Sequence, residues 1–387
     1  MSRGINAREN RKIAIFHHSF DPMGGAERVT ATLIEALNNV NICPDVYTSV
    51  PISRDYLGLF YGKKLCYKLV PALPFKINTM SIYQKVLTNL LSFRLAKYDV
   101  VINVTTPTIF DHIFKRHILY IHNPMFMITN QKYVTKFSLT SKYKKSLFWK
   151  LYYIPYEVIL QHSIKKSRAE LLANSHFTKW RLKKYAGLQS KVVYPPVQIS
   201  TFSLVFDNSN RKDVISIGRF SPEKMHLKQL EIAKKIPEIT FKFCGSVGTS
   251  YNWHWYGYVK SKAEQMDLRN VEFYPNIPLK KLVSLIGDSK VFIHTMLHED
   301  FGLTTCEAIA GGCIPCVIDS GGQKEIVPVK NLRFRSVKEA IKIIKHINNL
   351  SESELKGLRN KLFSHIQQFD EQHFKDNMLK VILHMQR

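Results

Sequence analysis

The chain has 387 residues, of which 45% are hydrophobic and 22% are charged. A chain of this length and apolar fraction can bury large cores, which excludes an intrinsically disordered protein and a disulfide-stapled miniprotein. Its 56 Lys and Arg outnumber its 30 Asp and Glu, so the net charge is +26. Such an excess indicates a polyanionic partner, with nucleic acid, an anionic membrane surface and anionic substrates as the candidates.

The basic excess is concentrated in the first half of the chain. Residues 1–200 hold 29 Lys and Arg against 10 Asp and Glu, a balance of +19, which leaves 27 against 20, or +7, for residues 201–387. The six cysteines are scattered in a chain long enough to fold without disulfides, so we expect a reducing, cytoplasmic compartment. We find no apolar signal region and no run of about 18 apolar residues, and therefore expect a peripheral protein on the cytoplasmic face of a membrane.

Short apolar runs of strand length alternate with helical patterns through the first half. The first run, at residues 12–16, precedes a turn-rich segment and a helix expected at 27–37. Further strands are expected at 45–50, 99–104, 117–122 and 171–175. Strands that alternate with helices indicate a parallel, doubly wound sheet.

The second half repeats this alternation after a polar segment that is typical of a linker, at residues 198–212. Strands are expected at 214–218, 239–245, 271–277, 291–296 and 313–318, with helices at 226–236 and 279–289 and another that includes 306–312. The predicted fold class is α/β, with two Rossmann-like domains facing each other and ligand at the carboxyl ends of their strands. We assign residues 1–200 and 201–365 to these domains, and residues 366–387 to a helix that crosses back to the first.

One segment, residues 298–327, combines two glutamates with a helix start. Glu299 and Glu307 are separated by seven residues that include Phe301, Gly302 and Leu303. The free amides at a helix N-terminus attract phosphate, and two carboxylates can accept hydrogen bonds from sugar hydroxyls. Spacing alone leaves open the alternative that Glu299 is a loop acid and Glu307 an ordinary residue on a helix surface.

The same segment resembles the signature of glycosyltransferase family four, retaining enzymes of GT-B fold, in which two glutamates at this spacing precede a small-residue helix and a Gly-Gly pair. Other segments resemble family motifs in the same order, namely GGAER at 24–28, YIHNP at 120–124, ANSHFTK at 173–179, VVYPPV at 192–197 and SIGRFSPEKMH at 216–226. Within the family, the chain looks most like the mannosyltransferases that extend lipid-linked oligosaccharides from GDP-mannose.

The resemblance implies four catalytic residues. Arg219 and Lys224 would stabilise the departing nucleoside diphosphate, and Glu299 would bind hydroxyls of the donor sugar. His122 would face the cleft near the anomeric carbon. Without the motif, His122 would more often be a structural histidine than a catalytic one, and Arg219 and Lys224 could be ordinary members of the basic set.

The resemblance also implies donor-binding residues. They are Gly24 and Gly25 near the diphosphate, the amides of Phe301, Gly302 and Leu303 at sugar or phosphate, Glu307 at the ribose, and Ile277 at the nucleobase. The chain departs from the family pattern at Met225 and at Pro275-Asn276, which leaves the identity of the base open. We expect no metal and no cofactor, because no Asp-x-Asp pair lies where a metal-bound diphosphate would need it. The Cys313 and Cys316 pair reads as part of a buried strand.

Two basic, aromatic segments, at residues 60–76 and 142–156, suit contact with an anionic bilayer and a lipid-linked acceptor. A core helix with a solvated lysine face is the alternative for both.

Taken together, these features favour a retaining, metal-independent glycosyltransferase that moves a hexose, with mannose from GDP-mannose favoured, to a lipid-linked or glycan acceptor at the membrane. The resemblance implies retention, and no carboxylate nucleophile is evident beside His122. The expectation from the family is therefore a front-face displacement. One alternative is a soluble glucan or disaccharide synthase that uses a UDP- or ADP-sugar. A basic nucleic-acid-binding protein is the alternative of another class, although the chain carries no signature of one.

Overall fold

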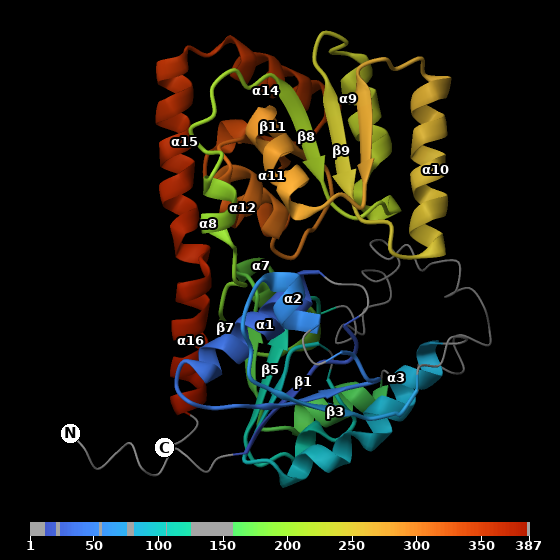
Figure 1. Cartoon of the computed structure of the whole chain (residues 1–387), viewed down its shortest axis with the longest axis vertical. Helices are drawn as coiled ribbons and strands as arrows, with labels where there is room; N and C mark the ends of the chain where they lie inside the picture. Colours follow the sequence, from blue (N-terminus) through green and yellow to red (C-terminus); the bar gives the residue numbers. More distant parts are fainter. Residues whose placement is uncertain are drawn as a thin grey trace. The chain divides into compact units, whose positions relative to one another are not determined.

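A computed structural model describes residues 12–20, 24–53, 56–75, 81–105, 107–124 and 158–384. The chain divides into two compact units (Figure 1). Unit 1 comprises Met1–Pro196 and Gln372–Arg387, and unit 2 comprises Val197–Glu371. The sequence-based boundaries, after residues 200 and 365, lie within a few residues of these divisions.

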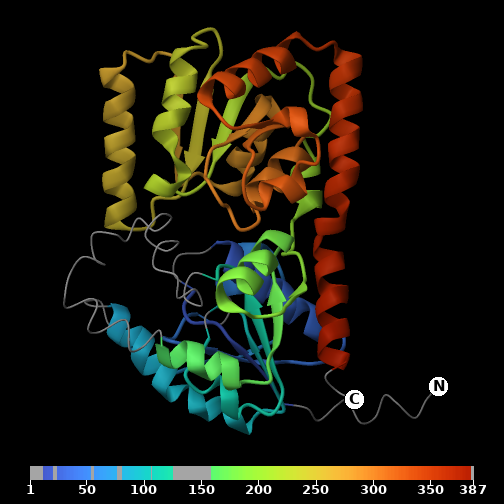
Figure 2. The same cartoon turned by 180° about the vertical axis from the view of Figure 1, so that it is seen from behind.

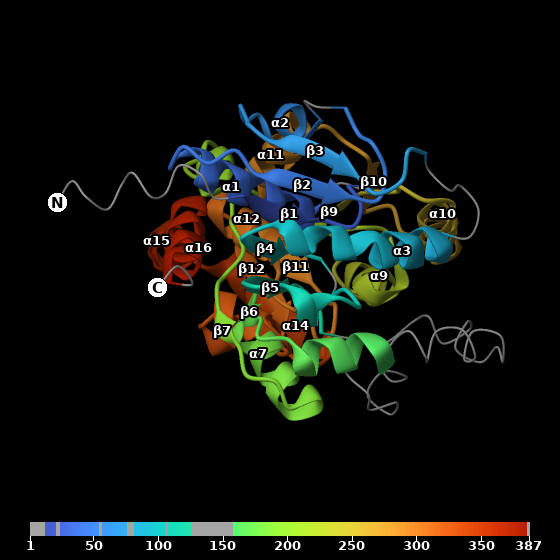
Figure 3. The same cartoon turned by 90° about the horizontal axis from the view of Figure 1, so that it is seen from below.

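Unit 1 contains, in its described residues, a parallel seven-stranded sheet of order β3-β2-β1-β4-β5-β6-β7, seen from below in Figure 3. The strands are β1 Ile13–Phe16, β2 Asp45–Thr48, β3 Lys68–Pro71, β4 Val100–Asn103, β5 His117–Ile121, β6 Glu170–Ala173 and β7 Lys191–Val192. The helices include α1 Gly25–Asn38, α2 Tyr56–Tyr61, α3 Ser81–Leu90, α7 His176–Arg181 and α16 Glu371–His384. The strands expected in this half are confirmed, whereas β3 and β7 were not predicted.

Both faces of the unit 1 sheet are covered. The apolar sides of α1, α2 and α16 pack on one face, and Phe374, Met378 and Ile382 are the buried contributions of α16. Leu95, from the 3-10 segment Leu91–Lys97, packs on the opposite side against Ala14 and Phe16. Two covered faces explain why the strands read as continuous apolar runs in the sequence.

Unit 2 contains a parallel six-stranded sheet of order β10-β9-β8-β11-β12-β13. The strands are β8 Asp213–Ile217, β9 Phe241–Gly245, β10 Val271–Pro275, β11 Ser289–His294, β12 Ile314–Ile318 and β13 Arg333–Phe334. The helices are α8 Ile199–Ser203, α9 His226–Lys234, α10 Ser250–Gln265, α11 Leu279–Asp288, α12 Leu303–Ala310, α13 Gln323–Ile326, α14 Val337–Asn349 and α15 Glu352–Ile366. The prediction of two doubly wound α/β sheets is confirmed.

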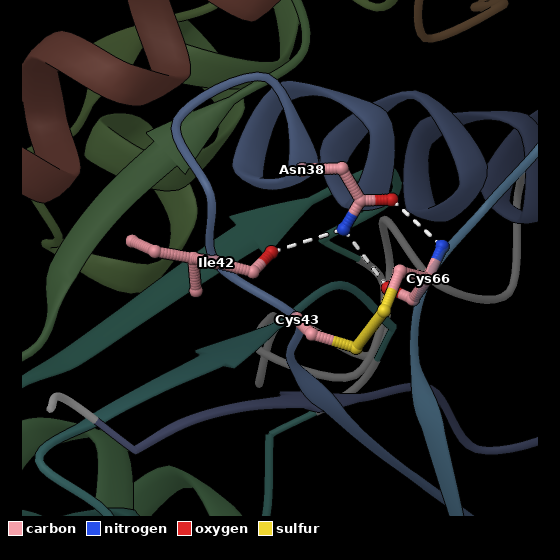
Figure 4. The surroundings of a disulfide bond; sticks show 4 residues. All are labelled: Asn38, Ile42, Cys43 and Cys66. Carbon is pink, nitrogen blue, oxygen red and sulfur yellow. Dashed lines mark hydrogen bonds between the residues drawn. A yellow bond between two sulfur atoms is a disulfide. The ribbon is translucent and has the colours of Figure 1, made fainter. Parts of the chain in front are cut away.

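Cys43 and Cys66 form a disulfide, contrary to the expectation that the chain holds none (Figure 4). Parallel pairing of β2 with β3 sets Asp45 opposite Lys68, which brings the two cysteines to a Cα separation of 5.4 Å. The Asn38 amide holds the same junction, because its Nδ2 donates to the Cys66 carbonyl oxygen at 2.9 Å and its Oδ1 accepts from the Cys66 N–H at 2.8 Å. Edge strand β3 is thereby fastened to the end of α1.

The two segments considered for membrane contact have different outcomes. Residues 142–156 lie outside the described residues. Residues 60–76 are not the core helix considered as an alternative, because they include β3, and Lys63 Nζ pairs with Glu35 Oε2 at 2.6 Å. Among the described residues, no helix is both long and apolar enough to cross a bilayer.

We expect reduction of the disulfide, or the double substitution C43A/C66A, to lower the free energy of unfolding by ~3 kcal/mol, because the bond closes a loop spanning 23 residues. Chemical denaturation of the wild type with and without reductant measures this loss. Reductant should leave the C43A/C66A variant unchanged. Equal stability of the oxidised and reduced wild type would contradict the predicted role of the bond.

Candidate functional site

The charged site of unit 2 is centred on Glu299, in the loop that follows β11. Its Oε2 accepts a hydrogen bond from Lys224 Nζ at 2.5 Å and lies 3.0 Å from Nε2 of His294, the last residue of β11. Lys224 lies in the 3-10 turn Pro222–Lys224 that follows β8. Since β8 and β11 are neighbours in the sheet, their carboxyl ends bring together residues 75 positions apart in the sequence.

The surroundings of Glu299 and His294 determine which of the two side chains is charged. Burial alone would raise the pKa of Glu299, but the Lys224 charge and the His294 hydrogen bond outweigh it and hold that pKa below its usual range. Burial lowers the pKa of His294, so its ring is neutral at pH 7 and Nε2–H donates to the carboxylate. The site therefore presents an ionised carboxylate, an ammonium and a neutral imidazole.

A second layer of hydrogen bonds positions Lys224. The Thr295 hydroxyl donates to the Lys224 carbonyl oxygen at 2.7 Å, and Gln229 Nε2 donates to that hydroxyl at 2.7 Å. The chain then turns through Met225, whose φ of 55° is left-handed, and enters α9. Met225, noted as a departure from the family pattern, is thus the residue that makes this turn.

The N-terminus of α12 follows the same loop. Gly302 precedes it with a φ of 118°, and a Cβ built there would lie 2.4 Å from Nε2 of Gln323. The Gly321-Gly322 pair packs against the loop that carries Glu299, since the Gly322 N–H donates to the Glu299 carbonyl oxygen at 2.8 Å. The helix N-terminus and the carboxylate are therefore held by one tightly packed pair of loops.

The remaining residues predicted for unit 2 take different positions. Arg219 is exposed and makes no ion pair with another described residue. Leu303 begins α12, while the Phe301 side chain is buried and packs edge-on against Phe369, so its ring is not available to a ligand. Glu307 is buried in α12, so the alternative of a surface helix residue is wrong. Ile277 is half-buried just beyond β10.

A buried histidine cluster of unit 1 lies beside the start of α1. His17, which follows β1, places Nδ1 2.7 Å from the Thr30 hydroxyl and Nε2 3.2 Å from Glu27 Oε1. His122 follows β5, and burial, with the nearby His17, lowers its pKa to about 4. Glu27 acts in the opposite direction on that pKa, so the structure places a carboxylate near His122, where the sequence indicated none.

Gly24 and Gly25 lie in the same part of unit 1, at the N-terminus of α1. Tyr61 donates its hydroxyl hydrogen to the Gly24 carbonyl oxygen at 2.7 Å, which anchors the glycine pair. A cavity of about 350 Å³ opens at the carboxyl ends of β1, β2 and β3. It is lined by Ser19, Phe20, residues 50–53, Tyr56, Pro74 and Phe75.

Three residues of these two sites were not predicted from the sequence, namely His17, Glu27 and His294. Each histidine stands at the carboxyl end of an expected apolar strand, where a polar residue at the ligand-binding edge was a usable signal. Glu27 lies inside the GGAER segment but reads there as an ordinary first-turn acid.

We expect Gly302→Ala to lower the free energy of unfolding by about 2–3 kcal/mol, because alanine is strained at this φ and its Cβ meets Gln323. Gly257→Ala is the control, because this glycine lies inside α10 with open space around it, and it should add about 0.5–1 kcal/mol. Urea denaturation compares the two. A Gly302→Ala variant as stable as the wild type would refute the packing described.

Glu299→Gln tests the charge network. Because the folded-state pKa of Glu299 is depressed, its contribution to stability is complete above its unfolded-state pKa and is lost as pH falls through the lower folded value. The variant should be less stable than the wild type by about 1–3 kcal/mol at pH 7, and this gap should shrink below about pH 4.5. Denaturation across pH measures it, with exposed Glu238→Gln as control. A gap that does not change with pH would contradict the assignment.

Parts of the chain are similar in sequence to known glycosyltransferases. Residues 204–367 match the family described as glycosyl transferases group 1. The chain is similar to GDP-Man:Man(3)GlcNAc(2)-PP-Dol alpha-1,2-mannosyltransferase of Xenopus laevis, with 26% identity over 210 residues that cover 49% of this chain and 43% of the relative. The human protein of the same name is 24% identical over 51% of this chain and 44% of its own length. The chain thus spans about half the length of these relatives.

Solved structures share the fold across both units. The Anabaena HepE protein in complex with UDP and glucose has a TM-score of 0.71 at 15% identity, with 96% of this chain and 99% of that chain covered. Sucrose-phosphate synthase from Thermosynechococcus elongatus has a TM-score of 0.75 at 13% identity, with 97% and 99% covered. These likenesses confirm the predicted GT-B fold. The family match itself lies within unit 2, at residues 204–367.

Proposed function

We propose that the chain is a retaining glycosyltransferase that transfers a hexose from a nucleoside diphosphate sugar, with GDP-mannose as the favoured donor, to a lipid-linked acceptor. The observation that carries this proposal is the Lys224–Glu299 pair beside the N-terminus of α12, within a glycosyl transferases group 1 domain. The Lys224 ammonium and the amides at the N-terminus of α12 suit the donor's diphosphate, on which negative charge grows during transfer. The Glu299 carboxylate suits the hydroxyls of the donor sugar.

The chemistry follows from these groups. Transfer breaks the bond between the anomeric carbon and a phosphate oxygen, and negative charge develops on the departing diphosphate. Lys224 and exposed Arg219 would stabilise that charge, each being worth about 3 kcal/mol in the transition state. Glu299, held ionised by Lys224, would accept hydrogen bonds from sugar hydroxyls. Glu307, Ile277 and the amides of residues 301–303 complete the proposed donor site.

Unit 1 would supply the acceptor side. Neutral His122 and the glycine pair Gly24-Gly25 would approach the donor sugar and diphosphate. The cavity at the carboxyl ends of β1 to β3, lined by both polar and apolar residues, offers a site for part of a lipid-linked acceptor. Glu27 is buried and engaged with His17, so we retain the front-face displacement, in which the leaving phosphate accepts the acceptor's proton.

The names of the relatives support GDP-mannose as donor and a lipid-linked acceptor, and the net charge of residues 1–200 supports work at a membrane. The Xenopus laevis and human proteins are named for GDP-mannose and a dolichol diphosphate-linked acceptor. The balance of +19 in residues 1–200 suits work at the anionic cytoplasmic face of a membrane. The described residues contain no cluster of three His, Cys, Asp or Glu that could hold a metal, and metal independence and the lack of a cofactor stay predictions.

Donor binding is tested by thermal shift with GDP-mannose, UDP-glucose, UDP-N-acetylglucosamine and UDP-galactose, because a ligand that binds only the folded state raises its stability. We expect the largest rise in melting temperature with GDP-mannose, undiminished by a metal chelator. Lys224→Ala should remove this rise and reduce transfer by about 100-fold or more. Lys228→Ala is the matched control, an exposed lysine on adjacent α9 that should behave as wild type.

A larger shift with a UDP-sugar would replace the favoured donor but keep the site. A Lys224→Ala variant that still binds and turns over donor would overturn the assignment of the site. Absence of a shift with every nucleotide sugar would overturn the proposed function.

A further inference from the structure

Two helical segments of unit 1 cover one core cluster. Residues 158–166 are helical, and residues 176–186 comprise α7 and the π-helical turn Leu182–Ala186. Ile164 of the first segment and Leu182 of the second pack in the same cluster with Leu119 and Ile121 of β5. Figures 2 and 3 show the two segments, in green, side by side on the sheet. We call the outer surface of these two segments the 158–186 face.

The 158–186 face is strongly basic. Residues 158–191 contain eight Lys and Arg but one acidic residue, Glu170, which already pairs with Lys191 at 2.8 Å. Four lysines of the face are exposed and make no ion pair with any described residue, namely Lys165, Lys166, Lys183 and Lys184. Because their charge is not balanced within the described part of unit 1, it is available to an external anion.

The same two segments also expose large apolar side chains. Val158, Ile159 and Trp180 expose 57%, 51% and 45% of their surfaces. Lys184 Nζ lies 4.7 Å from the centre of the Trp180 ring and 5.3 Å from that of Tyr185. Tryptophan, tyrosine and lysine together match the boundary between lipid headgroups and acyl chains, where rings and lysine stems are buried and charges reach phosphates.

We propose that the 158–186 face docks unit 1 on an anionic membrane surface. Trp180, Val158 and Ile159 enter the headgroup boundary, while the four lysines bind lipid phosphates. This inference rests on the proposed function, because a lipid-linked acceptor requires the enzyme to work at a bilayer. It names a surface other than residues 60–76 and 142–156, the segments that the sequence singled out.

The geometry favours a membrane over single-stranded nucleic acid, which also binds lysines and aromatic rings. Base stacking requires an open ring face. Phe177 stacks on Trp180 from the preceding turn, with centroids 5.9 Å apart, and Lys184 approaches the ring from the following turn. The exposed aliphatic side chains of Val158 and Ile159 offer nothing to a base but gain from contact with acyl chains.

Charge reversal tests the electrostatic part. Binding of the full chain to vesicles of equimolar phosphatidylcholine and phosphatidylglycerol is measured by co-sedimentation, with phosphatidylcholine vesicles for comparison. We expect K183E/K184E to weaken binding by at least about 20-fold, since each lysine near an anionic surface contributes about fivefold. The control K342E/K345E makes the same charge change on exposed lysines of α14 in unit 2 and should retain binding within about threefold, because these lysines are not part of the 158–186 face.

Fluorescence tests insertion of Trp180. Vesicles with brominated acyl chains quench tryptophans that reach the headgroup boundary. We expect this quenching to drop in Trp180→Phe but to persist in Trp253→Phe, which removes the exposed tryptophan of α10 in unit 2. Both changes keep an aromatic ring and leave the fold intact.

The face is the wrong one if K183E/K184E binds vesicles like the wild type, if the control loses as much, or if Trp180→Phe leaves quenching unchanged. Tighter binding of single-stranded RNA than of anionic vesicles, lost in K183E/K184E, would also overturn the proposal. Donor binding is read separately from the thermal shift with GDP-mannose, which K183E/K184E should keep. Vesicle binding without a rise in melting temperature with any nucleotide sugar would contradict the proposed function but would still support the docking face.

Discussion

The ion pair between Lys224 and Glu299 is the contact on which the proposed donor site depends. It joins the loops that follow neighbouring strands β8 and β11, at an Nζ to Oε2 distance of 2.5 Å. Removing two partly buried charges from water is costly, so such a pair persists only when further hydrogen bonds complete it. His294 completes the carboxylate, and the Thr295 hydroxyl fixes the lysine backbone. The result is a charged centre held ready beside a helix N-terminus.

Both units use the same combination of groups at the carboxyl edge of their sheets. A buried histidine follows or ends a strand and contacts a glutamate, as His17 contacts Glu27 in unit 1 and His294 contacts Glu299 in unit 2. Burial keeps His294 and His122 neutral, so they can orient or accept without adding charge. In this account, positive charge at the donor comes from Lys224 and Arg219 alone. Under the proposed function, the broad basic excess of unit 1 is left for a membrane surface rather than for the reacting groups.

Most of the strands were the predictable part of this molecule. Strands buried on both faces leave apolar runs in the sequence, as at residues 12–16 and 313–318, and the motif residues Lys224 and Glu299 do meet. Edge strand β3 was missed because it is only partly buried, and Lys68 with the lysines that precede it resembles a solvated face. Helix α10 was missed because Asn252, Val259 and Ala263 are its fully buried residues, which leaves aromatic residues exposed and no apolar stripe.

Features that depend on pairing between distant segments could not be read from the sequence. The Cys43–Cys66 disulfide requires β2 and β3 to be neighbours in register, and no local pattern states that they are. The 158–186 face likewise exists because two segments share one core cluster. Local charge counts placed the expected membrane contact on residues 60–76 and 142–156, and they did not single out this face.

A crystal structure of the chain with GDP-mannose tests most directly whether Lys224, Glu299 and the N-terminus of α12 form the donor site. We expect the diphosphate within hydrogen-bond distance of Lys224 Nζ and of the amides at the N-terminus of α12, and Glu299 within hydrogen-bond distance of the sugar hydroxyls. A donor bound away from the carboxyl ends of β8 and β11, with the Lys224–Glu299 pair unchanged and not contacted, would contradict it.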